Sequence, residues 1–122
     1  MTIDPALYEE SYASFLMEAQ DVLQRIEHDL FSLKDDRAPA TIHSLMRSAH
    51  TLKGSAASVE LNGIKQVAHV LEDIFKALYN PSIRIEGEVE SLLFQGYECL
   101  RLLLMAEITG GQIEEQEILN RA

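Results

Sequence analysis

Cysteine is almost absent from this chain, since Cys99 is the single example among 122 residues. One cysteine excludes an intrachain disulfide and a metal site built from several cysteines, and it fits a reducing compartment. Because Cys99 lies within the apolar run ECLRLLLM, we predict that it is a buried free thiol.

Long apolar runs are lacking as well. No stretch reaches the roughly 18 apolar residues typical of a membrane-spanning helix, and the acidic segment MTIDPALYEE has no apolar core like that of a signal peptide. We therefore expect a cytoplasmic chain that is not secreted and has no membrane partner. Hydrophobic residues make up 47% of the composition, which predicts one compact domain over residues 1–122.

Positive charge is scarce, and the net charge is −10. Such a chain is a poor partner for nucleic acid, because binding to the phosphate backbone needs a cationic face. The exception is the segment 37–71, in which Arg37, Arg47, Lys53 and Lys65 stand against Glu60 alone. This segment is therefore the one part of the chain that is not acidic.

Strand-type alternation is missing apart from the short stretch SIRIE, whereas helical periodicity is strong. Apolar residues recur every three or four positions from near Pro5 to the segment KDDRAP, from near Pro39 to Val59, and in 62–78 and 89–103. We expect Asn62 to cap the third helix. The glycines of TGG are expected to end the fourth, and QIEEQEILNRA to form a short fifth.

Short connections between long amphipathic helices favour antiparallel neighbours. The predicted fold is therefore all-α: an antiparallel up-down four-helix bundle over about residues 5–107, with a short additional C-terminal helix or the start of a linker in 108–122. We expect four aromatic residues to belong to its core rather than to a binding site, and His28 and His43 to lie at the surface. The four aromatic residues are Tyr8, Tyr12, Phe15 and Phe31.

The stretch SAHTLKGSAAS, residues 48–58, departs from an ordinary amphipathic helix. The apolar stripe of this helix passes through Ala49, so His50 lies about 100° away on the flank, together with Lys53, Gly54 and Ala57. Gly54 costs the helix roughly 1 kcal/mol relative to alanine. Such a residue suggests that another molecule approaches the backbone closely here.

An exposed histidine beside a cation and small side chains suits a phosphoryl acceptor. Neutral imidazole is a good nucleophile near neutral pH, and Lys53 could offset the charge of the phosphoryl oxygens. A partner protein must bring the phosphoryl group in line with the nucleophile, and Gly54 and Ala57 would leave room for it. Arg47, one turn before His50, adds a second cation to this flank.

The third helix supplies candidates that could orient the imidazole. His69 and Glu72 are one turn apart, and either can approach His50 if the second and third helices are antiparallel neighbours. Glu72 accepting a hydrogen bond from Nδ1–H would leave the lone pair on Nε2 for attack. A metal site formed by His50, His69 and Glu72 is the alternative by ligand type, although the charge of Lys53 would compete with the metal.

These motifs resemble those of a known family. HTLKGSAAS is similar to the His-x-x-Lys-Gly signature of histidine phosphotransfer (HPt) domains, and VAHVLED resembles the His-x-x-Glu element of the phosphotransfer domain in CheA-like kinases. The first helix, FLMEAQDVLQRIEHDLFSL, resembles that subgroup as well. The resemblance implies that His50 is phosphorylated, that Lys53 is a cation near the phosphate and that Glu72 orients His50.

The resemblance also implies a docking surface for partner proteins, to which we assign Arg47, Gly54, Ala57 and His69. No glycine-rich phosphate loop occurs, so we expect no cofactor and no kinase activity in this domain itself. ATP and Mg²⁺ would belong to the partners, which are a histidine kinase ATP-binding domain and a response-regulator receiver domain.

Two questions stay open at this stage. The chain could be a stand-alone relay protein or the N-terminal domain of a larger CheA-like kinase, and the likeness of the first and third helices favours the larger kinase. The alternative function is a non-catalytic helical adaptor or dimerisation bundle, which would use the basic flank for docking without chemistry.

Overall fold

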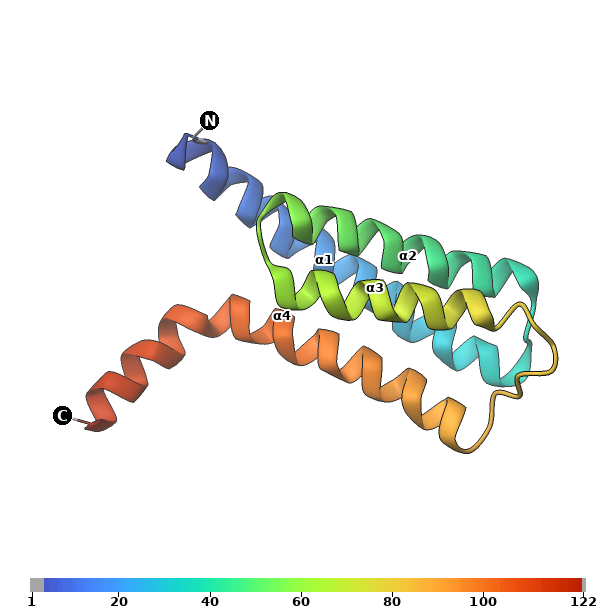
Figure 1. Cartoon of the computed structure of the whole chain (residues 1–122). Coiled ribbons are helices and arrows are strands. Elements are labelled where there is room, and N and C mark those ends of the chain that lie inside the picture. The colour runs from blue at the N-terminus through green and yellow to red at the C-terminus, as the bar shows by residue number, and fades with distance from the viewer. Residues whose placement is uncertain (1–3, 122) are drawn as a thin grey trace.

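The computed structural model describes the backbone of residues 4–121 and the side chains of residues 4–110. It contains four helices, α1 (Pro5–Asp35), α2 (Pro39–Ser58), α3 (Asn62–Ala77) and α4 (Glu88–Arg121), joined by short connections. Consecutive helices run in opposite directions (Figure 1). The expectation of an all-α four-helix bundle is confirmed, and no strand occurs in the described part of the chain.

The helix starts follow from local sequence chemistry. Pro5 and Pro39 occupy first-turn positions, where the missing N–H costs nothing, and the Asp4 carboxylate accepts a hydrogen bond from Ala6 N at 2.9 Å. The prediction that Asn62 caps α3 is wrong by one position. Leu61 is the cap residue and makes no side-chain cap bond, so Asn62 is the first helical residue.

Each helix packs against two others in the cyclic order α1, α2, α3, α4, and the most extensive interface joins α2 to α3. One continuous core fills the centre of the bundle. The apolar stripe predicted for α2 is buried throughout, from Ile42 to Val59. The core residues of α4 are Leu93, Leu100 and Leu104.

The predicted break at TGG and the separate fifth helix are wrong. The structure has one helix, α4, from Glu88 to Arg121, and its C-terminal part extends beyond the other helices (Figure 1). A glycine in a helix interior costs roughly 1 kcal/mol but keeps its N–H, so a helix can continue through it where proline would stop it.

Three side chains expected to be buried lie at the surface: Cys99, Phe31, and Leu92, which belongs to the apolar stripe predicted for 89–103. Cys99 is exposed, and so are Phe31 and Leu92, with 55% and 50% of their surface accessible. Cys99 and Leu92 each stand one position before a core residue of α4, which places them about 100° from the buried face. Because the sequence around Cys99 and Leu92 is almost continuously apolar, its pattern did not distinguish these exposed positions from the buried ones beside them. Tyr8 and Tyr12 are half-buried against the core and Phe15 is buried, as expected. His28 and His43 are exposed, as expected.

Polar contacts fasten both ends of the bundle. At one end the Arg37 guanidinium donates hydrogen bonds to the carbonyl oxygens of Leu78, Asn80 and Ile83, which ties the α1–α2 connection to the segment after α3. At the other end the Tyr8 hydroxyl donates to Val59 O at 2.9 Å, which ties α1 to the end of α2. Arg37 is therefore a structural cation and does not belong to the flank that bears His50.

Helices α3 and α4 pack closely at Gly96. A Cβ added there would come within 2.5 Å of Leu71 Cδ2, closer than real Cβ contacts. The absence of a side chain at position 96 thus lets Leu71 fill the interface. Leu71 immediately precedes Glu72 on α3.

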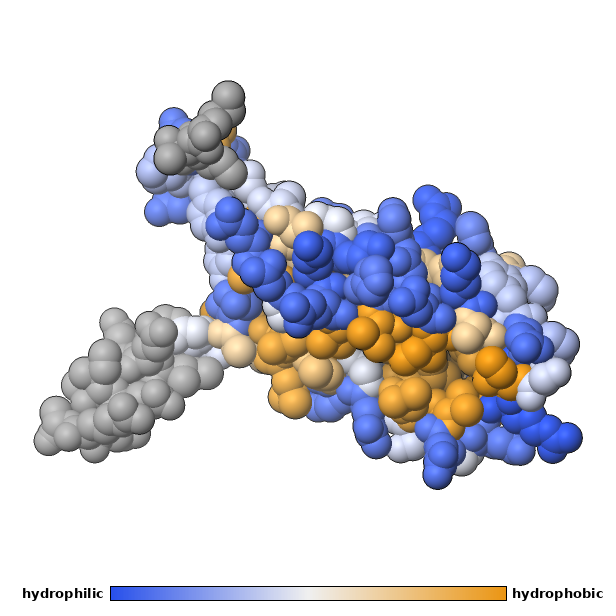
Figure 2. Space-filling model, in the orientation of Figure 1, coloured by the Kyte–Doolittle hydropathy of each residue, from blue (hydrophilic) through white to orange (hydrophobic). Residues whose placement is uncertain are grey.

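Apolar side chains gather on the face formed by α3 and α4 (Figure 2). A groove on this face is lined by residues that include Val70, Ile74, Leu92 and Cys99. No helix in the described part of the chain is long and apolar enough to cross a membrane.

Candidate functional site

His50 projects from α2 into solvent, with 70% of its side chain accessible. Its position follows from the helix register, because the adjacent Ala49 is completely buried against the core. Lys53 follows one turn later on the same flank and is less exposed, with 23% of its side chain accessible.

Glu72 on α3 contacts both of these α2 side chains. One carboxylate oxygen, Oε2, lies 2.7 Å from His50 Nδ1, and the other, Oε1, accepts a hydrogen bond from Lys53 Nζ at 2.7 Å. Only 16% of the Glu72 side chain is accessible to solvent. The structure therefore brings together three of the residues singled out from the sequence, held by the α2–α3 interface.

The ionisation of Glu72 determines the tautomer of His50. The hydrogen bond from Lys53 lowers the pKa of Glu72 below its ordinary value; burial opposes this effect, and the hydrogen bond with His50 adds to it. An ionised carboxylate can only accept hydrogen bonds, so Nδ1 must be the protonated nitrogen. In the neutral imidazole the lone pair then resides on Nε2.

The surface beside His50 is open. Gly54 is exposed, and a Cβ added to it would have no atom within 4 Å, which excludes a role in helix packing. Ala57, one turn further along α2, is exposed as well. A partner could thus approach the α2 backbone at this point without displacing any side chain.

Arg47 and His69 lie apart from the hydrogen-bonded group. Arg47 is exposed and, within the described residues, forms no ion pair. It does line a cavity of about 380 Å³ together with His50 and Glu72. His69 is paired with Asp73, with Nε2 and Oδ2 3.5 Å apart, and has no contact with His50.

The alternative metal site of His50, His69 and Glu72 is not assembled in the described part of the structure. Among the described residues, no cluster of three or more His, Cys, Asp or Glu side chains could hold a metal ion. Glu72 already uses one oxygen for Lys53 and the other for His50, and His69 is directed to Asp73 instead.

Two features of the site were missed in the sequence. Lys53 was taken as a cation facing a phosphate, whereas its direct partner is Glu72. Met46 and Thr51 line the cavity beside His50, and the only available signal was their place one turn before and one residue after it.

The site thus consists of an exposed imidazole held through Nδ1 by a carboxylate, on a four-helix bundle. Residues 10–107 match the Hpt domain family, so the chain belongs to the histidine phosphotransfer domains. The chain is a histidine phosphotransfer module.

The curated relatives that the chain matches include chemotaxis proteins named CheA. The chain is 33% identical over 103 residues to chemotaxis protein CheA of Borreliella burgdorferi, covering 84% of this chain and 12% of that protein. It is 27% identical over 108 residues to CheA of Treponema pallidum, covering 88% of this chain and 13% of that one. For CheA of Bacillus subtilis the identity is 29% over 98 residues, with 80% and 15% covered. No solved structure matches the chain significantly.

The contact between Lys53 and Glu72 gives a prediction about pH. Because the pKa of Glu72 is lowered, its interactions stabilise the fold fully above the ordinary pKa of 4.5 and are lost as the pH falls through the lowered value. Lys53→Met removes the main cause, so we expect the Glu72 titration to move up toward 4.5. Carboxyl ¹³C NMR against pH measures this shift. Lys65→Met, which alters an exposed lysine on α3, is the control, and an unchanged Glu72 titration in Lys53→Met would contradict the assignment.

Proposed function

We propose that His50 is the phosphoryl acceptor of this module, within a CheA-like histidine kinase, and that it passes the phosphoryl group to a receiver domain. The observation that supports this most directly is the contact of Nδ1 with Glu72 on a side chain that is 70% exposed, which leaves Nε2 free and accessible. The chain spans only 12–15% of the length of the three relatives described, and in this proposal the kinase and its partners are not part of it.

The proposed first step is an in-line displacement on ATP. The Nε2 lone pair forms a bond to the γ-phosphorus, and the bond from that phosphorus to the bridging oxygen breaks, its electrons leaving with ADP. The ring becomes positively charged because Nδ1 keeps its proton. Glu72, bonded to that Nδ1–H, stabilises the charge without moving.

In the second step the phosphoryl group leaves Nε2 of His50. A carboxylate oxygen of a receiver aspartate attacks the phosphorus, the P–N bond breaks, and its electron pair returns to Nε2. In this proposal ATP and Mg²⁺ are held by the kinase and receiver partners, and the relay operates in the cytoplasm. The chain contributes only the nucleophile, its orientation and an open surface.

The other residues receive supporting roles. Lys53 keeps Glu72 ionised and fixed, and its charge lies one turn from His50, near the incoming phosphoryl oxygens. Arg47 adds a cation to the same side of α2 without a carboxylate to neutralise it. Gly54 and Ala57 form the clear part of the docking surface, and His69 lies at its edge on α3.

A non-catalytic adaptor is the second candidate. The apolar groove on α3 and α4, with Val70 and Leu92 half exposed, is the observation that favours it, because such surfaces often mark protein contacts. An adaptor would not take up phosphate, so the labelling experiment separates the two functions.

Labelling tests the acceptor. We expect the wild-type chain, incubated with a CheA-type kinase domain and γ-labelled ATP, to take up label that is stable to alkali and lost in acid. His50→Gln should abolish the label, whereas His69→Gln and His43→Gln should retain it, because those imidazoles have no carboxylate at Nδ1 comparable to Glu72. Label on His50→Gln would exclude His50 as the sole acceptor.

Glu72 should affect the rate without being essential. Glu72→Ala removes the hydrogen bond that holds His50, together with the one to Lys53, so we expect phosphorylation to slow by roughly tenfold while the label stays on Nε2. Single-turnover labelling measures the rate, and imidazole ¹⁵N shifts report loss of the single Nδ1–H tautomer. Asp73→Ala, which alters the neighbouring exposed carboxylate, should leave both unchanged. A wild-type rate and tautomer in Glu72→Ala would refute the orienting role.

Substitution of Gly54 is expected to raise the stability of the domain and to slow phosphoryl transfer. Gly54→Leu should stabilise the domain by up to about 1 kcal/mol, since leucine favours helix more than glycine does and nothing lies within 4 Å to clash. The same side chain should slow transfer to a receiver by about tenfold by holding the partner away from the α2 backbone. Urea unfolding and transfer kinetics measure the two effects. Gly54→Ala is the matched control with near wild-type transfer; equal rates for both variants would disprove the clearance argument.

A further inference from the structure

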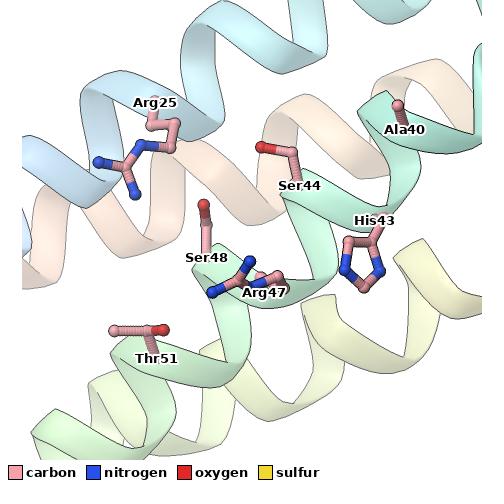
Figure 3. A pocket seen from close by; sticks show the side chains of 7 residues that line it. All are labelled: Arg25, Ala40, His43, Ser44, Arg47, Ser48 and Thr51. Atoms are coloured by element: carbon pink, nitrogen blue, oxygen red, sulfur yellow. The ribbon is translucent and has the colours of Figure 1, made fainter.

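A second cavity, of about 270 Å³, lies between α1 and α2 on the other flank of α2 (Figure 3). Every side chain that lines it can donate a hydrogen bond except that of Ala40. The donors are Arg25, His43, Ser44, Arg47, Ser48 and Thr51. A cavity with this lining is unusual in a chain whose net charge is −10.

The two arginines come from different helices and meet at this cavity. Arg25 extends from α1 and Arg47 from α2, and their guanidinium groups lie on either side of Ser48 in Figure 3. Neither forms an ion pair within the part of the chain that the structure describes, where the ion pairs of lysine and arginine involve Lys34, Lys53, Arg84 and Arg101. Two like charges at one cavity repel each other unless an anion lies between them.

Ser48 provides an independent observation. It is the one polar residue in the buried core of the described chain, with 3% of its surface accessible, and it also lines the cavity. Figure 3 shows the hydroxyl directed into the cavity. At this position the hydroxyl can donate a hydrogen bond to a ligand in the cavity.

One carboxylate beside the cavity is already hydrogen-bonded. Asp29 Oδ2 accepts a hydrogen bond from Ser44 Oγ at 2.6 Å, at the edge of the cavity. This contact leaves Ser48, Thr51 and both guanidinium groups available. Asp29 places one negative charge beside the cavity. Among the described residues it forms no ion pair with Arg25 or Arg47, so it does not neutralise the two guanidinium groups.

We propose that this cavity, the α1–α2 cleft, binds the phosphate group of a small molecule, either as inorganic phosphate or diphosphate or as a phosphate ester. Two guanidinium forks and two hydroxyls match the several oxygens of a phosphate, whereas one arginine would satisfy a carboxylate. The cavity has room for a phosphate and an attached group. The binding itself does not depend on the role of His50.

Arg47 links the α1–α2 cleft to the site already described, since it also lines the cavity that holds His50 and Glu72. An anion in the cleft draws the Arg47 guanidinium toward α1 and away from the His50 side. An anion bound in the α1–α2 cleft would therefore slow phosphoryl uptake by His50. This consequence rests on the proposed phosphotransfer.

The binding is tested by ¹H–¹⁵N NMR, including the arginine Nε–H signals, during titration with phosphate, diphosphate and ADP at constant ionic strength set by chloride. We expect saturable shifts at Arg25, Arg47 and Ser48 with at least one of the three anions. Diphosphate as the tighter ligand indicates a free anion, and ADP as the tighter ligand indicates a phosphate ester. Arg25→Gln should weaken binding about tenfold, because it removes a charge-assisted contact.

Arg101→Gln, which alters an arginine already paired with Glu98, should bind like the wild type. The same titration in His50→Gln should give the same affinity, so a failure of the proposed phosphotransfer would leave this result intact. Shifts that do not saturate, or that are equal in Arg25→Gln, overturn the proposal. Absence of binding together with slower transfer from a partner in Arg25→Gln also overturns it, and would mean that the cleft docks an acidic protein surface.

Discussion

The geometry of the candidate site depends on one carboxylate that is shared between two helices. Glu72 reaches from α3 to α2 and holds His50 Nδ1 with one oxygen and Lys53 Nζ with the other, both at 2.7 Å. The arrangement works only if α2 and α3 lie close together. Ala49 and Ala56 on α2 and Ala68 on α3 are completely buried, and such small side chains permit a short distance between helix axes. The core packing thus positions a group that is itself at the surface.

Much of the fold could be predicted because its signals are local. Proline marks the starts of α1 and α2, and the three-to-four spacing of apolar residues defines the buried stripes. The errors arose where the apolar pattern is wide or the competing signals are weak. Leu92 and Cys99 adjoin core positions in an almost continuous apolar run, so periodicity could not separate the buried from the exposed face. Consecutive glycines weaken a helix without removing a backbone hydrogen bond, so TGG did not end α4.

The candidate site was predictable for a different reason. His50, Lys53 and Gly54 are close in sequence, and the helix geometry alone places them on one flank. The approach of Glu72 depended on the pairing of two helices, which short connections made probable. The partner of Lys53 could not be deduced, because a long flexible side chain can reach several neighbours and only the packed structure selects one of them. The two arginines at the α1–α2 cleft are 22 positions apart in the sequence, and no short motif connects them.

Gly96 carries a consequence for how this domain can change in evolution. It belongs to α4, from which no described side chain lines the cavity beside His50, yet it sets the space that Leu71 occupies, and Leu71 is the residue before Glu72. A larger residue at position 96 would force the Leu71 side chain to shift, one position before the shared carboxylate. Drift at this position is therefore constrained by chemistry on the opposite side of the bundle. Lineages that acquire alanine there should carry a smaller residue at position 71, so that the two positions change together although neither touches the histidine.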